Sequence, residues 1–167
     1  TVTVEVLLRE FRRQDLDALF FLEQRCYPEP YRFRFDQLLS ILLDKNVITV
    51  VAESPKGLPA SPSMLAGGMI LRVEPFQQRL VLITLMVSEA LRRQGLGRRL
   101  LETALTLGRQ GRHSELLVPV EKENPNAGAF LAACGLQESP ALEPFFTRPE
   151  EGAVWRMEFE TPAVEGT

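Results

Sequence analysis

An apolar run that leads into a basic, glycine-containing turn constrains the fold of this chain more than any other feature. The run Leu80–Val87 is apolar except for Thr84, and this length and β-branched content predict a buried strand. A turn follows at Arg92-Arg93-Gln94-Gly95-Leu96-Gly97-Arg98-Arg99. Leucines from Leu96 onward then recur at helical spacing and predict an amphipathic helix that closes near Gly108 and Gly111. The segment is therefore expected to be a strand, a turn and a helix.

This strand–turn–helix segment has the chemistry of an anion site. The first N–H groups of a helix lack intrahelical partners and carry about half a positive charge, and glycines let a phosphate approach the main chain. Two other phosphate motifs do not fit, because a dinucleotide fingerprint requires glycine at Leu100 and a P-loop requires lysine followed by serine or threonine. On spacing alone, a plain structural turn remains the alternative. The arginines between residues 92 and 112 would attract phosphates or form a solvated helix face.

The other elements follow from hydrophobic periodicity and from turn residues. Asp15 is placed as an N-cap for the first helix, which should stop at the prolines after Tyr27. In chain order we expect a strand with Val2, Val4 and Val6, a helix from Leu16 to near Tyr27, a helix at Phe35–Leu43, strands at Val47–Ala52, Met69–Val73 (after Gly67-Gly68) and Leu80–Val87, the helix from Leu96, a strand at Glu115–Val120, a helix at Asn126–Cys134 ended by Gly135, and a strand at Val154–Phe159. With two strands expected at the end of this series, of which only the last is located by its pattern, the order β-α-α-β-β-β-α-β-α-β-β predicts an α+β fold on a mostly antiparallel, twisted sheet.

Composition limits the class of protein. The length of 167 residues, with 45% hydrophobic and 25% charged residues, predicts a single domain over residues 1–167. A net charge of -3 gives no overall basic field, so we expect no nucleic-acid partner. Cys26, Cys134 and His113 lack metal-ligand spacing, so we expect no metal and two packing thiols. We find no secretory signal and no membrane-spanning run, and expect a cytoplasmic protein.

Two motifs in the correct order resemble those of the GNAT superfamily of N-acetyltransferases. Arg92, Gly95 and Gly97 fill the superfamily's acetyl-CoA pyrophosphate pattern of Arg or Gln, two residues, Gly, one residue, Gly or Ala. Downstream, Asn124, Ala127 and Phe130 precede Gly135-Leu136, similar to the superfamily's Asn-x-x-Ala helix and its terminal Gly-Phe. The resemblance covers essentially the whole chain and implies a GNAT-like fold with helices on both faces of the sheet.

The resemblance also implies the residues that bind acetyl-CoA as co-substrate. The main chain of the strand end would pair with the pantetheine arm, the turn would hold the pyrophosphate, and the Asn-x-x-Ala helix would line the path of coenzyme A. The implied residues are Leu85, Met86, Val87, Arg92, Arg93, Gln94, Gly95, Leu96, Gly97, Arg98, Asn124, Ala127 and Phe130.

The acceptor side of the resemblance is less complete. Residues 23–31 resemble the Phe-Pro-x-Pro-Trp region of enzymes that acetylate ribosomal-protein N-termini, and a rigid loop is the alternative interpretation. The aromatic pair after Pro144 is interpreted as an opposite wall or as hairpin packing. The enzymes that acetylate ribosomal-protein N-termini have a glutamate base at the position of Pro119 in this chain. Much of the superfamily has a tyrosine acid at the position of Leu131. Glu121 and Tyr31 are the remaining catalytic candidates, against the alternatives of a solvated charge and a packed aromatic.

The sequence therefore predicts an acetyl-CoA-dependent N-acetyltransferase, an acyltransferase of groups other than aminoacyl. The acceptor would be a primary amine of a small molecule or a protein N-terminus, attacking the thioester directly. The alternative is a catalytically weak or silent acyl-CoA-binding regulatory protein, motivated by the missing base and acid. We expect no membrane partner, and an apolar strand near the C-terminus is compatible with a homodimer.

Overall fold

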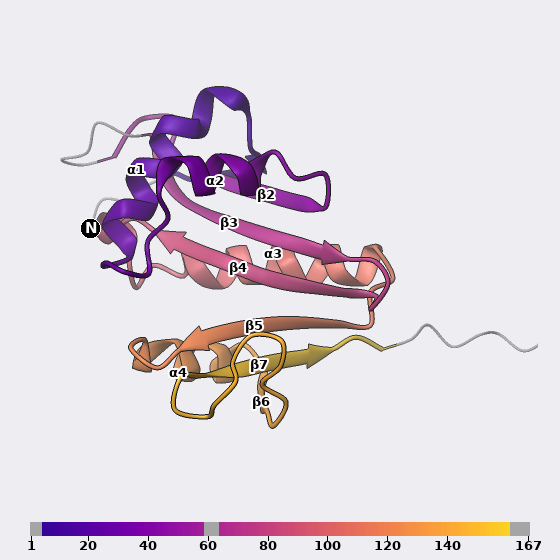
Figure 1. Cartoon of the computed structure of the whole chain (residues 1–167). Helices are drawn as coiled ribbons and strands as arrows, with labels where there is room; N and C mark the ends of the chain where they lie inside the picture. The colour runs from indigo at the N-terminus through magenta and orange to yellow at the C-terminus, as the bar shows by residue number, and fades with distance from the viewer. Residues whose placement is uncertain (1–4, 59–63, 161–167) are drawn as a thin grey trace, which may run out of the picture. The chain divides into compact units, whose positions relative to one another are not determined.

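The structure is a computed structural model that describes residues 5–58 and 64–160 (Figure 1). Its elements are β1 (Leu7–Glu10), η1 (Arg13–Asp15), α1 (Leu16–Cys26), α2 (Phe35–Leu42), β2 (Val47–Glu53), β3 (Leu65–Glu74), β4 (Arg79–Val87), η2 (Glu89–Leu91), α3 (Leu96–Gln110), β5 (Glu115–Glu121), α4 (Pro125–Ala133), β6 (Gln137–Ser139) and β7 (Gly152–Glu158). The strands form one sheet in the order β1-β2-β3-β4-β5-β7-β6. Apart from the two short 3-10 turns, this element order confirms the predicted one and the α+β class.

The chain divides into two compact units, and several elements pass through both. The first unit comprises Thr1–Arg72 and Thr84–Leu100, and the second comprises Val73–Ile83 and Leu101–Thr167. The first therefore contains β1, α1, α2, β2, most of β3, the end of β4 and the start of α3. The second contains β5, α4, β6 and β7.

In the first unit, two adjacent glycines let helices approach β3 from opposite faces. A Cβ at Gly67 would lie 3.2 and 3.3 Å from the leucine side chains at 96 and 100 of α3, whereas a Cβ at Gly68 would lie 2.8 Å from Leu19 of α1. Successive residues of a strand face opposite sides of the sheet, so α1 and α3 lie on opposite faces. The sequence prediction placed these glycines before the strand and was wrong here: both lie within β3, where a Cβ at Gly67 would also come within 2.7 Å of the Met86 carbonyl oxygen of β4.

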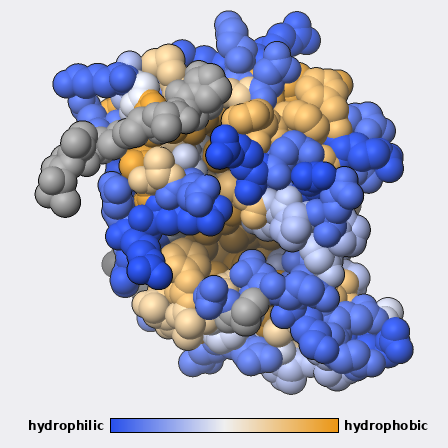
Figure 2. Space-filling view, turned by 90° about the vertical axis from the view of Figure 1, so that its left-hand side faces the viewer, coloured by the Kyte–Doolittle hydropathy of each residue, from blue (hydrophilic) through white to orange (hydrophobic). Residues whose placement is uncertain are grey.

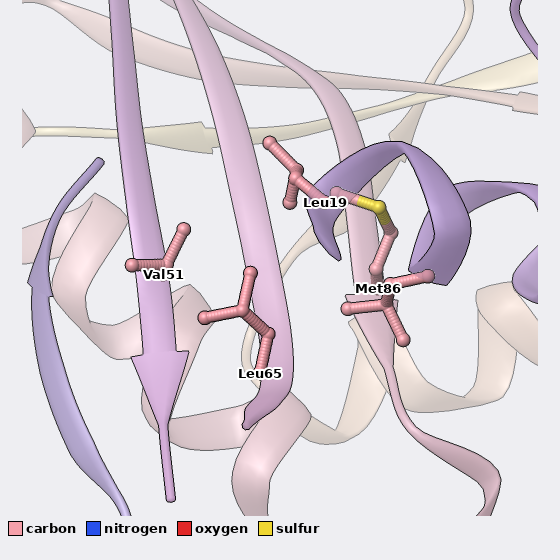
Figure 3. Close-up of a cluster of buried hydrophobic side chains, with 5 residues drawn as sticks. Leu19, Val51, Leu65 and Met86 are labelled. Atoms are coloured by element: carbon pink, nitrogen blue, oxygen red, sulfur yellow. The ribbon is translucent and has the colours of Figure 1, made fainter. Parts of the chain in front are cut away.

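The apolar core of the first unit lies between α1 and the sheet. Its cluster of buried side chains comprises Leu19, Leu22, Val51, Leu65 and Met86. Figure 3 shows that they come from α1 and from β2, β3 and β4. Leu19 and Met86 are fully buried, so the last residues of β4 are fixed against the first helix.

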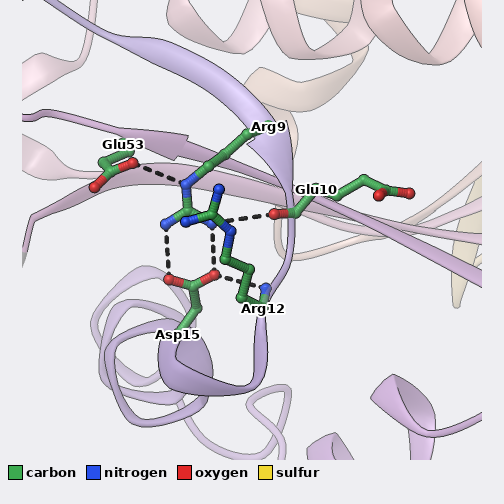
Figure 4. A network of polar contacts seen from close by, with 5 residues as sticks. All are labelled: Arg9, Glu10, Arg12, Asp15 and Glu53. Atoms are coloured by element: carbon green, nitrogen blue, oxygen red, sulfur yellow. Dashed lines mark hydrogen bonds and ion pairs between the residues drawn. The ribbon is translucent and has the colours of Figure 1, made fainter.

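An ion-pair network connects the start of the chain to this core. The Arg9 guanidinium donates to Asp15 through Nη1 and Nη2 at 2.8 and 2.9 Å, and through Nε to Glu53 at 2.8 Å (Figure 4). The Asp15 carboxylate also accepts the Arg12 N–H at 2.8 Å. Asp15 precedes α1 as predicted, but it does not cap α1 with its side chain. Its oxygens instead hold the preceding 3-10 turn and Arg9.

The first strand begins later than its alternating valines predict. Val2 and Val4 lie outside the described residues, and Val6 is not part of a strand. β1 instead pairs antiparallel with β2 from Leu7, opposite Glu53. Arg9 is held there by Glu53 and Asp15, so charge pairing as well as apolar alternation sets the position of this strand.

The second unit is built around the antiparallel pair β5 and β7. Their register runs over the whole of β5, and β4 joins β5 in parallel at Arg79–Val81. Gly135 ends α4 with a φ of 93°, as predicted for a helix terminator. The predicted end of α3 is confirmed at Gly111, since the helix ends at Gln110, but Gly108 lies inside the helix, where a Cβ would collide with the Phe159 ring.

Hydrophobic surface is interspersed among hydrophilic side chains on the face shown in Figure 2. In the described part of the chain, no helix is long and apolar enough to cross a bilayer.

Candidate functional site

The turn predicted to bind an anion joins β4 to α3 within the first unit, and we call residues 88–98 the anion turn. Ser88 begins it with an N–H that donates to the Ala66 carbonyl oxygen at 2.7 Å. The main chain then takes positive φ values of 66° at Arg93 and 80° at Gly95. Leu91 and Leu96 are buried on either side of these residues. The turn is therefore anchored at both ends by apolar side chains, while the residues between them are exposed.

The geometry at the start of α3 suits a phosphate. The first helical hydrogen bond runs from the Arg99 N–H to the Gly95 carbonyl oxygen at 3.1 Å. The N–H groups of Leu96, Gly97 and Arg98 therefore lie ahead of the helical ladder and point toward the helix N-terminus. A Cβ at Gly95 would meet no atom within 4 Å, so space is open beside the main chain. Backbone N–H donors, a helix dipole and flanking arginines together can bind a pyrophosphate.

Two side chains from the end of α1 occupy the edge of β4 that faces away from β3. The Tyr27 hydroxyl donates to the Leu85 carbonyl oxygen at 2.9 Å, and the Cys26 thiol donates to that of Val87 at 3.5 Å. The intervening Met86 carbonyl lies against Gly67 of β3. Because carbonyls alternate along a strand, Leu85 and Val87 present their N–H groups at the same outer edge. The strand end where pantetheine is expected is thus in contact with α1.

The Cys26 thiol is held in its protonated form. Burial raises its pKa above the ordinary value, an effect that the nearby Arg92 guanidinium and the Val87 hydrogen bond oppose but do not cancel. A protonated thiol is a weak nucleophile. Cys26 therefore fits its predicted packing role and places α1 next to the anion turn.

Glu23 is a fully buried carboxylate that the sequence predictions did not single out as a site residue. It lies on α1 with 0% exposure, one turn from Leu19. Its Oε1 accepts the Phe33 N–H at 2.9 Å and its Oε2 accepts Gln24 Nε2 at 2.9 Å. Burial raises its pKa, although both hydrogen bonds act in the opposite direction. The signal in the sequence was an acidic residue on the apolar face of a helix.

The predicted site residues are distributed over the two units. The strand end Leu85–Val87 and the turn residues 92–98 lie together in the first unit. Tyr31 is also there, in the loop between α1 and α2, with 37% exposure. The remaining cofactor candidates belong to α4 in the second unit, where Asn124 occupies the N-cap position and its carbonyl accepts the Ala127 N–H at 3.3 Å.

The other predicted residues of the second unit differ in burial. Phe130 is half-buried on α4. Glu121 is the exposed last residue of β5, opposite Gly152. Pro119 is half-buried in β5, whereas Leu131 is buried on α4. Across residues 5–58 and 64–160, no three His, Cys, Asp or Glu side chains gather as a metal site.

Comparisons with known structures show the same fold. The ribosomal-protein-S18-alanine N-acetyltransferase from Escherichia coli superposes with a TM-score of 0.75 at 17% identity, over 98% of this chain and 99% of that chain. The PaiA N-acetyltransferase from Thermoplasma acidophilum, solved in complex with coenzyme A, gives 0.73 at 14% identity over 93% and 99%. The spermidine/spermine N-acetyltransferase SpeG from Vibrio cholerae gives 0.64 at 22% identity over 92% and 91%.

The sequence comparisons identify the family. No curated protein sequence matches significantly. The family model for the acetyltransferase (GNAT) family, in contrast, matches residues 15–136. This match spans α1 through α4 and includes the β4 end, the anion turn and the Asn-x-x-Ala helix. The chain belongs to the GNAT family of acetyltransferases.

Proposed function

We propose that this protein transfers the acetyl group of acetyl-CoA to a primary amine of low pKa, such as the α-amino group of a peptide or a small molecule. The observation that carries the proposal is the anion turn at the start of α3, with its open Gly95 and its N–H donors beside exposed arginines. The family uses acetyl-CoA, and one structural neighbour binds coenzyme A. Main-chain N–H groups near Val87 would position the thioester.

The preference for an acceptor of low pKa rests on the absence of a glutamate base at Pro119. Glu23 is enclosed and has hydrogen bonds on both oxygens, so it is a poor base for an incoming amine. A lysine amine with a pKa of about 10.4 is neutral only to roughly one part in 2,500 at pH 7. An α-amine with a pKa of about 7.7–8.0 is neutral to roughly 10–15%. Without a base the α-amine is therefore the better nucleophile.

The reaction balances without a further co-reactant. The neutral amine forms a bond from nitrogen to the acetyl carbon, and the carbon–sulfur bond breaks. The nitrogen loses one proton, and the departing thiolate of coenzyme A gains one, directly or through water. Positioning supplies most of the rate in this scheme, and the absence of general catalysis lowers it by about 10²–10⁴-fold.

The second candidate function is a regulatory protein that binds acyl-CoA with little or no turnover. Pro119 and Leu131 favour it, because neither side chain can transfer a proton. Both candidates need the donor site, so donor binding is measured first and turnover second.

Calorimetric titration with acetyl-CoA tests the donor site. Gly97→Glu places a carboxylate among the N–H donors of α3 and is expected to abolish micromolar binding. Leu43→Glu adds the same charge at an exposed position after α2 and should leave binding intact. If the wild type does not bind acetyl-CoA, or if Gly97→Glu binds as tightly as the wild type, the donor site is not at this turn.

Release of free thiol across a panel of amines and peptide N-termini tests transfer itself. We expect α-amines to react faster than lysine-like amines at pH 7. Tight acetyl-CoA binding without turnover above hydrolysis would favour the regulatory function. Lysine-like amines that match α-amines at pH 7 would contradict the proposed acceptor class.

A further inference from the structure

Two consecutive side chains of α1 bind the main-chain N–H and the main-chain carbonyl of one residue in the following loop. Glu23 Oε1 accepts the Phe33 N–H at 2.9 Å, and Gln24 Nε2 donates to the Phe33 carbonyl oxygen at 2.7 Å. Gln24 Nε2 also donates to Glu23 Oε2 at 2.9 Å, which closes the ring. We call Glu23, Gln24 and the Phe33 main chain the Phe33 clamp.

The loop between α1 and the clamp is fixed at its other end as well. Tyr27 leaves α1 with its hydroxyl on the Leu85 carbonyl of β4 at 2.9 Å. Inside the loop, the Tyr31 N–H donates to the Pro28 carbonyl oxygen at 2.9 Å, and Arg32 pairs with Glu29 at 2.6 Å. The loop therefore starts at the strand end where the thioester is expected and ends at a buried carboxylate. Tyr31 lies between these anchors with its side chain partly exposed.

Stability alone does not account for a carboxylate at position 23. Removing a carboxylate from water is costly, and an apolar residue on the core-facing side of α1 would avoid that cost. Glu23 has 0% exposure, and Arg32 is the cation that acts on it, at a distance. What the carboxylate adds to packing is the hold on Phe33. A loop fixed in advance loses less entropy when it binds a ligand.

We propose that Glu23 and Gln24 are positioning residues that hold residues 28–32 as a preformed wall of the acceptor site. This inference rests on the proposed acetyl transfer for the role of the wall, but not for the clamp itself. The amine donor would dock against a loop shaped before it arrives, with Tyr31 as its exposed aromatic contact. Glu23 acts through Phe33 and does not take the proton.

The test weakens the clamp without touching the donor site. Gln24→Met removes both hydrogen bonds of a half-buried side chain, and Gln24→Lys restores a donor for both oxygens. Gln14→Met makes the same chemical change at an exposed glutamine of η1 and is the matched control. Glu23→Gln is a second variant, because it sets two amide N–H₂ groups against each other.

Limited trypsin digestion of the intact protein tests directly whether the clamp holds the main chain at Phe33. Trypsin cleaves after arginine and lysine, and Arg32 and Arg34 border the clamped Phe33. Fragments cut after these two arginines are followed by mass, apart from any cut at the lysine that Gln24→Lys introduces. Losing one or two hydrogen bonds is expected to raise the cleavage rate at these bonds about 5- to 30-fold. Gln24→Lys should return the rate toward that of the wild type, and Gln14→Met should not change it. Equal rates in all variants would overturn the clamp.

The KM for an amine from the acceptor panel tests whether residues 28–32 form a wall of the acceptor site. We expect Gln24→Met and Glu23→Gln to raise the KM for the amine by a similar factor and to leave the calorimetric Kd for acetyl-CoA unchanged. Faster cleavage with an unchanged amine KM would overturn the wall. If the wild type transfers acetyl to no amine, the proposed function and the wall both fail, and digestion still decides the clamp.

Discussion

At the scale of single residues, Thr84 is unusual because its polar side chain is buried without a hydrogen-bond partner among the described residues. It lies in β4 at 5% exposure, on the same face of the strand as Met86. Within the described residues, its buried hydroxyl has no hydrogen-bond partner. A buried unpaired hydroxyl costs about 1–3 kcal/mol, so this site carries a free-energy penalty in the middle of the core.

Replacing this hydroxyl by a methyl group should stabilise the protein. Thr84→Val keeps the shape of the side chain and removes the unpaired group, so the free energy of unfolding should rise by about 1 kcal/mol in urea denaturation. Thr84→Ser keeps the hydroxyl and removes the methyl group, and should lower stability. A loss of stability in Thr84→Val would show that the hydroxyl is bonded.

Residues 15 and 23 show what the sequence could predict at this scale and what it could not. Asp15 was correctly placed before α1, because acidic N-caps have a local signature. Its actual partner, Arg9, depends on where β1 lies, which is a tertiary fact. Glu23 occupies an apolar face at helical spacing, but whether such a carboxylate is buried depends on a loop ten residues later.

At the scale of elements, the order of helices and strands could be predicted because each one has its own period and terminators. The helix at α2 and the strand at β5 match the predicted bounds to within one residue. Several of the errors fall where glycine does not terminate an element. Gly67, Gly68 and Gly108 lie within elements at positions where a partner side chain or backbone comes too close for a Cβ, and that closeness has no local signature in the sequence.

The anion turn was the part of the candidate site that could be predicted best. Its residues are contiguous, and strand, turn and helix follow from one stretch of sequence. The contact of α1 with β4 could not be predicted, because Tyr27 and Leu85 are far apart in the chain. The acceptor side depends on such contacts, which is why the catalytic candidates Glu121 and Tyr31 remain predictions.

The two glycines of β3 should differ in how much stability an alanine substitution costs. Gly67→Ala would place its Cβ 2.7 Å from the Met86 carbonyl oxygen, which belongs to the backbone of the neighbouring strand. Gly68→Ala would meet the end of the Leu19 side chain at 2.8 Å, which can rotate. We expect Gly67→Ala to lower the free energy of unfolding by about 1–3 kcal/mol and Gly68→Ala by less.

Denaturant melts of both alanine variants measure this difference. A gain of about 0.4–1 kcal/mol from the stiffer unfolded chain applies equally to both and cancels in the comparison. If Gly68→Ala proves the more costly change, the packing of Leu19 is more rigid than that of the β4 backbone.

At the scale of the whole molecule, two carboxylates give opposite contributions to the pH dependence of stability. The hydrogen-bonded Arg9 guanidinium holds the pKa of Asp15 below its ordinary 3.8. Asp15 therefore contributes stability that is present above that value and is lost as the pH falls through its lowered pKa. Burial raises the pKa of Glu23 above its ordinary 4.5, so its contribution is greatest at low pH and declines as the pH rises through the raised pKa.

Asp15→Asn and Glu23→Gln should separate the two contributions. Asp15→Asn is expected to flatten the acid limb of stability below about pH 4, while exposed carboxylates that also pair with arginine keep part of the slope. Glu23→Gln should instead remove the decline above about pH 4.5. Urea midpoints from pH 2 to pH 8 measure both, and an unchanged acid limb in Asp15→Asn would refute the role of Arg9.

The glycine pair of β3 also has an evolutionary consequence. Gly67 meets backbone, which no substitution elsewhere can trim, whereas Gly68 meets a side chain that can be exchanged for a smaller one. Among descendants of a common ancestor, position 67 should therefore be invariant. Positions 68 and 19 should instead covary, with a larger residue at one position accompanied by a smaller residue at the other.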